Sequence, residues 1–377
     1  MSWLVSGNTV RVGSDDLGKT RENPRMASAG VHGIPARRVA TVNDQESRDE
    51  ESSDMNRPPH PAPRLSTLMS RGWRPVEPPL RPVLFVNPRS GDGAATRNRV
   101  VERARERGVE AVTFGPGDDL RTRILEVVAD GADALGVAGG DGSLADVAAV
   151  AAAHGLPFVC IPCGTRNHFA LDLGVDRRDV PGALDAFTDA VERLIDVGEV
   201  NGRIFLNNVS LGIYGEAVRQ AAYRDTKVRT LAETARRVLG PSGRVPALRL
   251  GADTGREHAR LAVLLVSNNP YAPGLATRPT LASGQLGILM LDTPEERQHP
   301  PGRAWSAPHL EVQAPATVHA GIDGEAVELG TPLEFALRPA ALRVRISARH
   351  PGASPAARIP SPGSRRAAAQ PLPPTAE

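Results

Sequence analysis

The residues best suited to chemistry lie in the segment Gly139-Gly140-Asp141-Gly142-Ser143, which follows an apolar run from Ala134 to Ala138. The run is typical of a buried strand, and the Ala- and Val-rich residues Ser143 to Ala153 are typical of a helix. A glycine turn between them lets backbone N–H groups approach a phosphate, and the helix N-terminus adds a favourable dipole. Asp141 alone would repel an anion, so it favours a Mg²⁺ ion, the ion's waters or a hydroxyl about to be phosphorylated. The alternative is a tight turn in which Asp141 is the helix N-cap.

Two more polar loops follow short apolar runs in the same half of the chain. The run Pro82 to Val86 leads into Asn87-Pro88-Arg89-Ser90-Gly91, and Pro157 to Ile161 leads into a loop through His168. Helices are expected at 94–107 and from Asp118, the expected cap, to about 129, with a strand at 109–113 between them. Alternating strands and helices predict a doubly wound parallel sheet. Ligands of such sheets bind beyond the carboxyl ends of the strands, so one crevice can collect all three loops.

The pattern changes near residue 191. Residues 193–207 predict a hairpin with a turn at Asn201-Gly202. Short β-rich runs follow at 245–251, 258–267, 286–292, 308–314, 332–337 and 342–347. They predict an antiparallel β-sandwich, interrupted by one helical segment at 215–239.

Both ends of the chain have the composition of segments that do not fold. Residues 1–80 combine an acidic, Ser-rich run with many prolines, and residues 351–377 are rich in Pro, Ala and Ser. Such sequence buries too little apolar surface to offset its ordering entropy. We therefore expect a disordered extension at 1–80, an α/β domain at 81–191, a β-sandwich at 192–350 and a disordered tail at 351–377.

Composition excludes several classes. A formal net charge of +2 gives no general attraction to nucleic acid. Cys160 and Cys163 are the two cysteines, too few for a disulfide scaffold, and we interpret them as small buried residues rather than as a redox or zinc pair. No apolar stretch is long enough for a transmembrane helix, and the N-terminus lacks the apolar core of a signal peptide. We expect a cytoplasmic protein.

A basic segment is the candidate for membrane contact. The segment from residue 216 to residue 249 contains eight Arg or Lys residues and three acidic residues, with apolar residues between them. Residues 219–249 could lie against an anionic membrane surface. The alternative is a solvated helix face that covers the β domain.

The chain contains five motifs whose order along the sequence resembles that of the diacylglycerol kinase catalytic domain family. This family comprises soluble lipid kinases related to sphingosine and ceramide kinases. The motifs are Asn87-Pro-x-Ser-Gly91, Gly139-Gly-Asp-Gly-Ser143, Pro162-x-Gly-Thr-x-Asn167, Asn207-Asn-Val-Ser-Leu-Gly212 and Asp323-Gly-Glu325. They span about residues 82–347. Each motif alone is weak, but the ordered set is specific.

The resemblance implies transfer of the γ-phosphoryl group of ATP to a lipid hydroxyl, with Mg²⁺, in a cleft between two domains. It implies that Asp141, Glu325 and Asp323 are the catalytic residues. Glu325 would accept the proton with Asp323 beside it, and Asp141 would reach the nucleotide-bound Mg²⁺. The residues implied to line the nucleotide are Asn87, Pro88, Arg89, Ser90, Gly91, Thr113, Gly139, Gly140, Gly142, Ser143, Thr165 and Asn167. Without the resemblance, Asp323-Gly324 reads as a hairpin turn with solvated acids.

The sequence departs from the family at one metal site. Bacterial members commonly carry an acidic Asp-Gly-x-Leu-Asp pattern associated with a structural Mg²⁺, whereas residues 282–287 here contain no carboxylate. We expect that separate site to be lost. His168 also replaces a common Asp, and Ser143 a common Thr.

Three functions follow as hypotheses. The first is a lipid kinase at the inner face of the membrane, with no nucleic acid partner and a homodimer left open. The second is a kinase of a soluble substrate with an NAD-kinase-like fold, and the third is a nucleotide-binding regulator without turnover. Asn207, Asp323 and Glu325 argue against the second, and Asp141 with Glu325 argues against the third.

Overall fold

The computed structural model describes residues 62–212, 249–251, 257–258, 261–272, 277–292 and 302–358. All of them belong to one compact unit, residues 50–377. The segment predicted to contact a membrane, 219–249, lies outside the described residues except for the strand position of Arg249. In the described ranges, no helix combines the length and the apolar character needed to span a bilayer.

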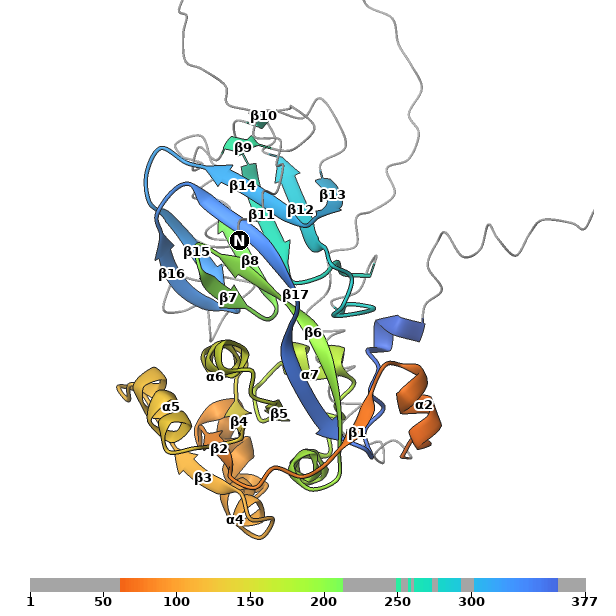
Figure 1. The fold of residues 1–377 in the computed structure, drawn as a ribbon. Coiled ribbons are helices and arrows are strands. Elements are labelled where there is room, and N and C mark those ends of the chain that lie inside the picture. The colour runs from red at the N-terminus through yellow and green to blue at the C-terminus, as the bar shows by residue number, and fades with distance from the viewer. Residues whose placement is uncertain are drawn as a thin grey trace, which may run out of the picture. The chain divides into compact units, whose positions relative to one another are not determined.

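Four parallel strands form the centre of the first half. They are β2 (Pro82–Val86), β3 (Glu110–Thr113), β4 (Ala134–Gly139) and β5 (Phe158–Pro162), in the order β5-β4-β2-β3. Every residue of β2, β4 and β5 is buried, which requires cover on both faces of the sheet. The contacts α5 with α6 and α4 with α8 pair the covering helices. The predicted doubly wound parallel sheet is confirmed (Figure 1).

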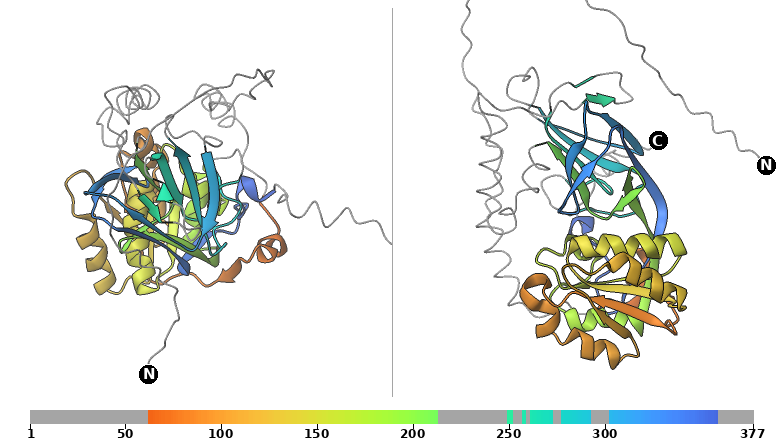
Figure 2. Two further views of the ribbon diagram at one scale, coloured as in Figure 1. Left: turned by 90° about the horizontal axis from the view of Figure 1, so that it is seen from above. Right: turned by 90° about the vertical axis from the view of Figure 1, so that its left-hand side faces the viewer.

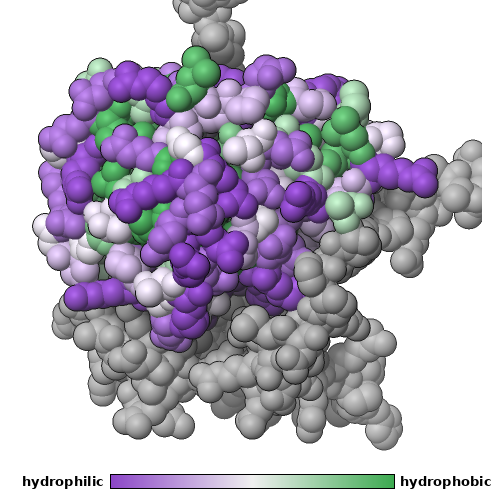
Figure 3. Space-filling model, turned by 90° about the horizontal axis from the view of Figure 1, so that it is seen from below, coloured by the Kyte–Doolittle hydropathy of each residue, from purple (hydrophilic) through white to green (hydrophobic). Residues whose placement is uncertain are grey.

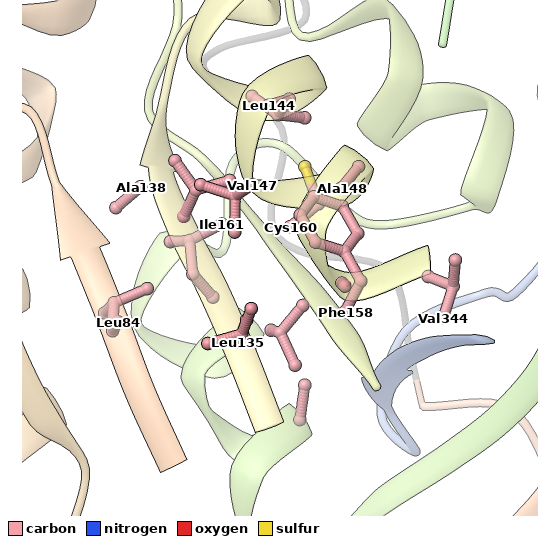
Figure 4. Close-up of a cluster of buried hydrophobic side chains, with 14 of the residues drawn as sticks. Leu84, Leu135, Ala138, Leu144, Val147, Ala148, Phe158, Cys160, Ile161 and Val344 are labelled. Carbon is pink, nitrogen blue, oxygen red and sulfur yellow. The ribbon is translucent and has the colours of Figure 1, made fainter. Parts of the chain in front are cut away.

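The helix after the glycine turn packs directly on these strands. Helix α6 (Asp141–His154) buries Leu144, Val147 and Ala148, and Gly155 ends it in a left-handed conformation. Figure 4 shows the three side chains above Phe158, Cys160 and Ile161 of β5, with Val344 of β17 at the border of the cluster. Because α6 is fixed by this core, its first turn is held rigidly at the end of β4.

The other helices differ in detail from the sequence-based expectation. The helix predicted at 94–107 is broken into α3 (Ala94–Arg97) and α4 (Val100–Arg105), because Arg99 adopts a φ of 50°. Helix α5 (Leu120–Ala129) is capped by Asp119 and not by Asp118, since Asp119 Oδ1 accepts from Thr122 N at 3.0 Å. The remaining ones are η1 (Ser90–Gly93), α7 (His168–Leu173), α8 (Val180–Ala183) and η2 (Leu184–Phe187).

Two long strands join the halves of the chain. β6 (Ala190–Val200) and β17 (Leu333–Ser347) pair antiparallel with each other on both sides of a register shift between Arg338 and Leu342. β17 also pairs in parallel with β5 and antiparallel with β14 (His309–Gln313). The predicted boundary between residues 191 and 192 therefore falls inside a strand. The helices gather around the parallel strands, while the described second half consists of strands (Figure 2).

The second half is the predicted β-sandwich. Its six-stranded sheet has the order β13-β12-β11-β8-β15-β16, and every pairing in it is antiparallel. These strands are β13 (Gly302–Ala307), β12 (Leu286–Asp292), β11 (Leu261–Ser267), β8 (Asn208–Gly212), β15 (Val318–Ile322) and β16 (Glu325–Leu329). An apolar core that includes Phe205, Met290 and Phe335 fills the space between this sheet and the upper part of the larger one. Small strands β9 (Arg249–Gly251) and β10 (Glu257–His258) extend the larger sheet.

The predicted hairpin is confirmed. β6 pairs with β7 (Arg203–Phe205) through Asn201 and Gly202, whose φ angles are 48° and 78°. Two consecutive positive φ angles are those of a type I′ turn, which matches the twist of the flanking strands. In the second half, the strands β8, β13, β15 and β16 were not predicted.

The prediction of disorder is wrong for residues 62–80 and 351–358. Helix α2 (Leu65–Ser70) and strand β1 (Arg74–Val76) are ordered, and β1 pairs with β6. Trp73 has no exposed surface, and its Nε1 donates to Gly352 O at 2.7 Å, just before η5 (Pro355–Arg358). The prediction used average composition, which misses one large aromatic side chain that fills a core site.

The face seen in Figure 3 is mostly hydrophilic, and its hydrophobic residues form small separate groups. Such scattered apolar residues are ordinary for a protein surface.

Candidate active site

The three polar loops meet at the carboxyl ends of β2, β4 and β5, as predicted. Gly91, with a φ of 54°, lies so close to the third loop that a Cβ on it would be 2.5 Å from Cys163 O. A Cβ on Gly164 would be 2.9 Å from Gly140 Cα. These approaches leave no room for side chains. The glycines therefore serve loop packing as well as open access to backbone N–H groups.

Some of the predicted nucleotide-lining residues shape their own loops. Asn87 Oδ1 accepts from Arg89 N at 3.1 Å. Asn167, with a φ of 52°, accepts from Gly164 N at 2.8 Å and donates from Nδ2 to Gly164 O at 2.7 Å. Because these amides bond to their own loops, the groups left open for a ligand lie elsewhere: Pro88, Arg89 and Thr165 are exposed, and Ser90 and Ser143 are half-buried.

Thr113 lies at the same edge of the sheet. It ends β3 and is the register partner of Val86, the residue before Asn87. Its side chain is exposed, and its carbonyl oxygen accepts from Arg123 Nη1 at 3.0 Å. The structure thus brings Thr113 next to the 87–91 loop.

Glu325 reaches the glycine loop from the other half of the chain. A Cβ on Gly142 would lie 2.0 Å from Glu325 Oε1, so the carboxylate packs on the bare backbone of the first turn of α6. Glu325 begins β16 after a two-residue turn in which Asp323 and Gly324 have φ angles of 48° and 89°. Two motifs from opposite halves of the sequence, one ending in Ser143 and the other in Glu325, therefore form one site.

Asp141 occupies the middle of this site. Burial raises the pKa of Asp141, and the opposing influences are the nearby amide of the Asn207 side chain, the charges of Arg278 and Arg166, and the Phe169 N–H. Even so, Asp141 Oδ1 and Asn207 Nδ2 are buried atoms without a partner in full hydrogen-bond geometry among the described residues. We interpret the pair as close but not bonded, which leaves a lone pair and an N–H for a ligand.

Asp323 has a different environment. Its carboxylate accepts from three backbone N–H groups, Leu206 at 2.8 Å, Asn207 at 2.8 Å and Asn208 at 3.0 Å. Burial raises the pKa of Asp323 to about 7, while the three N–H groups act in the opposite direction. Both oxygens are engaged, so Asp323 holds the 206–208 segment and is not a solvated turn residue.

Sequence reasoning missed Arg278, a fully buried charged side chain in this region. It has no exposed surface and lies in no motif. Its Nε donates to Asp172 Oδ2 of α7 at 2.6 Å, and its Nη2 donates to Asn207 Oδ1 at 3.0 Å. A lone Arg between prolines and threonines carries no local signal, so its role depends on contacts distant in sequence.

The segment without carboxylates, 282–287, is held by side chains from elsewhere. Asn269 Oδ1 accepts from Ser283 N at 2.7 Å and from Ser283 Oγ at 2.6 Å, and Asp196 Oδ2 accepts from Gly284 N at 2.9 Å. In the described ranges, no group of three or more His, Cys, Asp and Glu side chains is arranged to hold a metal ion. The loss of a separate structural Mg²⁺ stays a prediction.

The two cysteines are free and buried. Burial raises the pKa of Cys160 well above its usual value and that of Cys163 to about 12. Thiols of this kind are poor nucleophiles, which fits their interpretation as packing residues.

Comparison with known proteins agrees with the motifs. The diacylglycerol kinase catalytic domain family matches residues 81–200. A Pseudomonas aeruginosa protein named probable lipid kinase YegS-like is 32% identical over 272 residues, which cover 66% of this chain and 88% of that protein. A Mycobacterium tuberculosis diacylglycerol kinase is 36% identical over 120 residues, or 31% of this chain and 39% of that protein.

A solved structure shares the fold. A crystal structure of a Bacillus anthracis protein with a provisional diacylglycerol kinase name has a TM-score of 0.56 and 19% identity, covering 71% of this chain and 96% of that one. The family match and these relatives, together with the fold and the converging loops, show that the chain belongs to the diacylglycerol kinase catalytic domain family. This is a family of lipid kinases, and it places the chain among the phosphotransferases.

Proposed function

We propose that the protein transfers the γ-phosphoryl group of ATP to the hydroxyl of a lipid alcohol, diacylglycerol or a related lipid. One observation carries the proposal: Glu325 packs on Gly142, next to Asp141, at the start of α6. Two carboxylates from different halves of the chain thus flank a loop built for phosphate. Phosphoryl transfer requires this combination of oxygen-binding backbone, charge stabilisation and a group that orients the attacking hydroxyl.

The loops supply the nucleotide site in this proposal. Backbone N–H groups of Gly139 to Ser143 and of the 87–91 loop face the phosphates, and Thr113 and Thr165 border the nucleotide. Glu325 accepts the proton of the lipid hydroxyl as the oxygen attacks phosphorus. Asp323 is a positioning residue, because its oxygens already accept backbone N–H groups of residues 206–208.

Asp141 fits a nucleotide-bound Mg²⁺. Its Oδ1, which has no hydrogen-bond partner in the described part of the chain, is the kind of hard oxygen ligand that Mg²⁺ prefers, directly or through a coordinated water. A single carboxylate cannot hold the ion alone, so its remaining ligands would be phosphate oxygens and waters. When bound, the ion would spread the charge that develops on the transferred group.

The lipid acceptor is the finer part of the proposal, and it rests on the family and its lipid kinase relatives. We propose that the reaction takes place at the cytoplasmic surface of the membrane, with residues 219–249 as the contact and without nucleic acid. A soluble acceptor remains the alternative. A nucleotide-binding regulator without turnover is less consistent with two carboxylates in place.

Incubation of the full chain with [γ-³²P]ATP, Mg²⁺ and a total lipid extract tests the proposal directly. We expect one or more labelled lipids, identified by mass spectrometry, and no labelled lipid with Asp141→Asn. Label transfer only to water-soluble compounds would support the soluble-substrate alternative. ATP binding with no transfer to either fraction would support the regulator.

A further inference from the structure

We propose that Arg278 is a positioning residue for Asp141, and that it acts through the side-chain amide of Asn207. The inference rests on the proposed function, because it assigns a task within that same site. Arg278 lies outside the motifs that define the family match and comes from the loop before β12.

The guanidinium of Arg278 is completely enclosed and nearly saturated with acceptors. Asp172 accepts from both the backbone N of Arg278, at 2.8 Å, and its Nε, at 2.6 Å. Nη1 donates to Leu206 O at 2.6 Å and to Asn268 O at 2.8 Å. The side chain therefore ties α7 to the ends of β7 and β11, and a charge buried so deeply needs all of these partners.

The remaining nitrogen selects the orientation of one amide. Nη2 donates to Asn207 Oδ1 at 3.0 Å. An Asn side chain has an acceptor end and a donor end, so binding the oxygen on one side points Nδ2 to the other. Since guanidinium offers donors only, the flipped amide would place two donors against each other. Arg278 thus fixes which end of Asn207 faces away from it.

That other end faces Asp141. The Asn207 side chain is the foremost hydrogen-bonding influence that lowers the pKa of Asp141, and the charge of Arg278 acts next. Asn207 Nδ2 is buried and has no full hydrogen bond within the described part of the chain, nor has Asp141 Oδ1. The backbone of Asn207 is held from two sides, because its N–H donates to Asp323 and its carbonyl oxygen accepts from Arg278 Nη1 at 3.4 Å. Among the described hydrogen bonds of the Asn207 side chain, the one from Arg278 fixes the direction of the amide.

The geometry gives a chain of contacts from α7 to the catalytic centre, Asp172 to Arg278 to Asn207 to Asp141. Stability alone does not explain it, since buried ion pairs often stabilise a fold no better than apolar residues of the same size. The arrangement instead fixes a donor beside the one carboxylate whose orientation the phosphoryl transfer needs. A small misplacement of such a group can reduce the rate by about 100-fold.

The test compares three single variants of the full chain. Asn207→Asp keeps the acceptor for Arg278 but removes the donor that faces Asp141. Arg278→Lys keeps the buried charge but cannot span Asp172 and Asn207 together. Arg345→Lys is the matched control, because Arg345 also makes a nearly buried ion pair, with Glu192 at 2.8 Å, and contacts no residue of the site in the described ranges.

We expect Asn207→Asp and Arg278→Lys to lower kcat by about 10- to 100-fold, with the KM for ATP changed less than about threefold. Arg345→Lys should lose comparable thermal stability and keep its kcat. If kcat falls in proportion to the loss of Tm in all three variants, or if Asn207→Asp keeps its kcat, Arg278 has a structural role alone and the proposal is wrong.

Crystal structures of the variants give a readout that needs no turnover. We expect the Asp141 carboxylate to leave its wild-type rotamer in Asn207→Asp and Arg278→Lys but not in Arg345→Lys. An unchanged Asp141 in the first two would refute the positioning role. If wild-type protein phosphorylates no lipid, the proposed function fails, and the rotamers still decide the question of Arg278.

Discussion

The three loops of the site, here called the loop side, differ from the buried residues behind them, here called the support, in how many of their polar atoms are hydrogen-bonded. The loops at 87–91, 139–143 and 162–168 consist of small residues, exposed side chains such as Thr165, and Asp141, whose buried Oδ1 has no hydrogen-bond partner among the described residues. The support behind them, around Arg278 and Asp323, is buried and engages almost every polar atom. Groups that bind a ligand must be left available, whereas groups that hold them must be satisfied.

The largest effect should come from the two carboxylates of the site, Asp141 and Glu325. Asp141→Asn and Glu325→Gln each keep the shape of the side chain and remove its charge. We expect each to lower kcat by about 10²- to 10⁴-fold, the range for a group that transfers a proton or stabilises transition-state charge. Steady-state assays with Mg·ATP and the lipid found in the extract measure it.

Nearby acids serve as controls for these two variants. Asp146 lies five residues along α6 from Asp141, and Glu328 lies on β16 with Glu325. Glu328 is exposed and Asp146 is half-buried, and neither belongs to the three loops or to the pair of carboxylates. Asp146→Asn and Glu328→Gln should therefore change kcat less than about twofold. Near-normal turnover of either Asp141→Asn or Glu325→Gln with an intact fold would contradict the comparison.

The second effect concerns stability and comes from Trp73, a buried side chain in a segment that was predicted to be disordered. Trp73→Ala should lower the free energy of unfolding by about 3–5 kcal/mol, because it empties a fully buried aromatic site. A chain of residues 79–350 lacks Trp73 and also Gly352, which accepts from it, and should be less stable still. Urea unfolding followed by circular dichroism measures both.

A chain of residues 62–358 is the control for the truncation. It keeps α2, β1 and η5 and should unfold at nearly the same urea concentration as the full chain. Equal stability of the 79–350 and 62–358 chains would mean that the contact of Trp73 with Gly352 contributes nothing.

The loop side could be predicted from the sequence because the residues that indicate it are neighbours in the chain. Strand, glycine turn and helix are adjacent in the chain, so Gly139 to Ser143 indicated both the fold and the phosphate site. The turn at Asn201-Gly202 could be predicted in the same way, because two residues that accept positive φ lie between two β-rich runs.

The support could not be predicted because its contacts are distant in sequence. Arg278 meets Asp172 across 106 positions, and Asp323 meets Asn207 across 116. Neither pairing leaves a pattern in the residues around it. The same holds for Trp73, whose partner Gly352 is 279 positions away. The resemblance placed Asp323 beside the proton acceptor, but it carried no information on the three backbone N–H groups that its carboxylate accepts.

An intermediate effect tests the contact between the two sides. Gly142→Ala places a methyl group where Glu325 Oε1 now lies, since the added Cβ would be 2.0 Å from it. We expect kcat to fall by about 10-fold or more as Glu325 is displaced, while Tm stays the same or rises because Ala favours the helix. Kinetics and a thermal melt on one preparation show both.

The double variant Gly142→Ala with Glu325→Asp supplies a control. The shorter carboxylate leaves space for the methyl group, so Gly142→Ala should reduce kcat less when Glu325→Asp is already present than in the wild type. Strictly additive losses would mean that Gly142 and Glu325 do not interact.

The smallest effect concerns His350, a buried polar side chain elsewhere in the α/β half. His350 is buried, yet within the described residues neither of its ring nitrogens has a partner in hydrogen-bond geometry, and Asp179 Oδ2 lies 3.5 Å from Nε2. Burial lowers the pKa of His350 below its usual 6.5, while Asp179, Asp176 and Asp185 act in the opposite direction.

The sign of the pH dependence follows from that direction. Below about pH 6.5 the unfolded chain binds a proton at this position before the folded chain does, so the contribution of neutral His350 to stability is lost as the pH falls through its folded pKa. We expect the Tm of the wild type to decrease between pH 7 and pH 5 more steeply than that of His350→Gln. His154→Gln, at the exposed end of α6, should keep the wild-type slope. Parallel slopes for His350→Gln and wild type would show that His350 takes up its proton without a loss of folding stability.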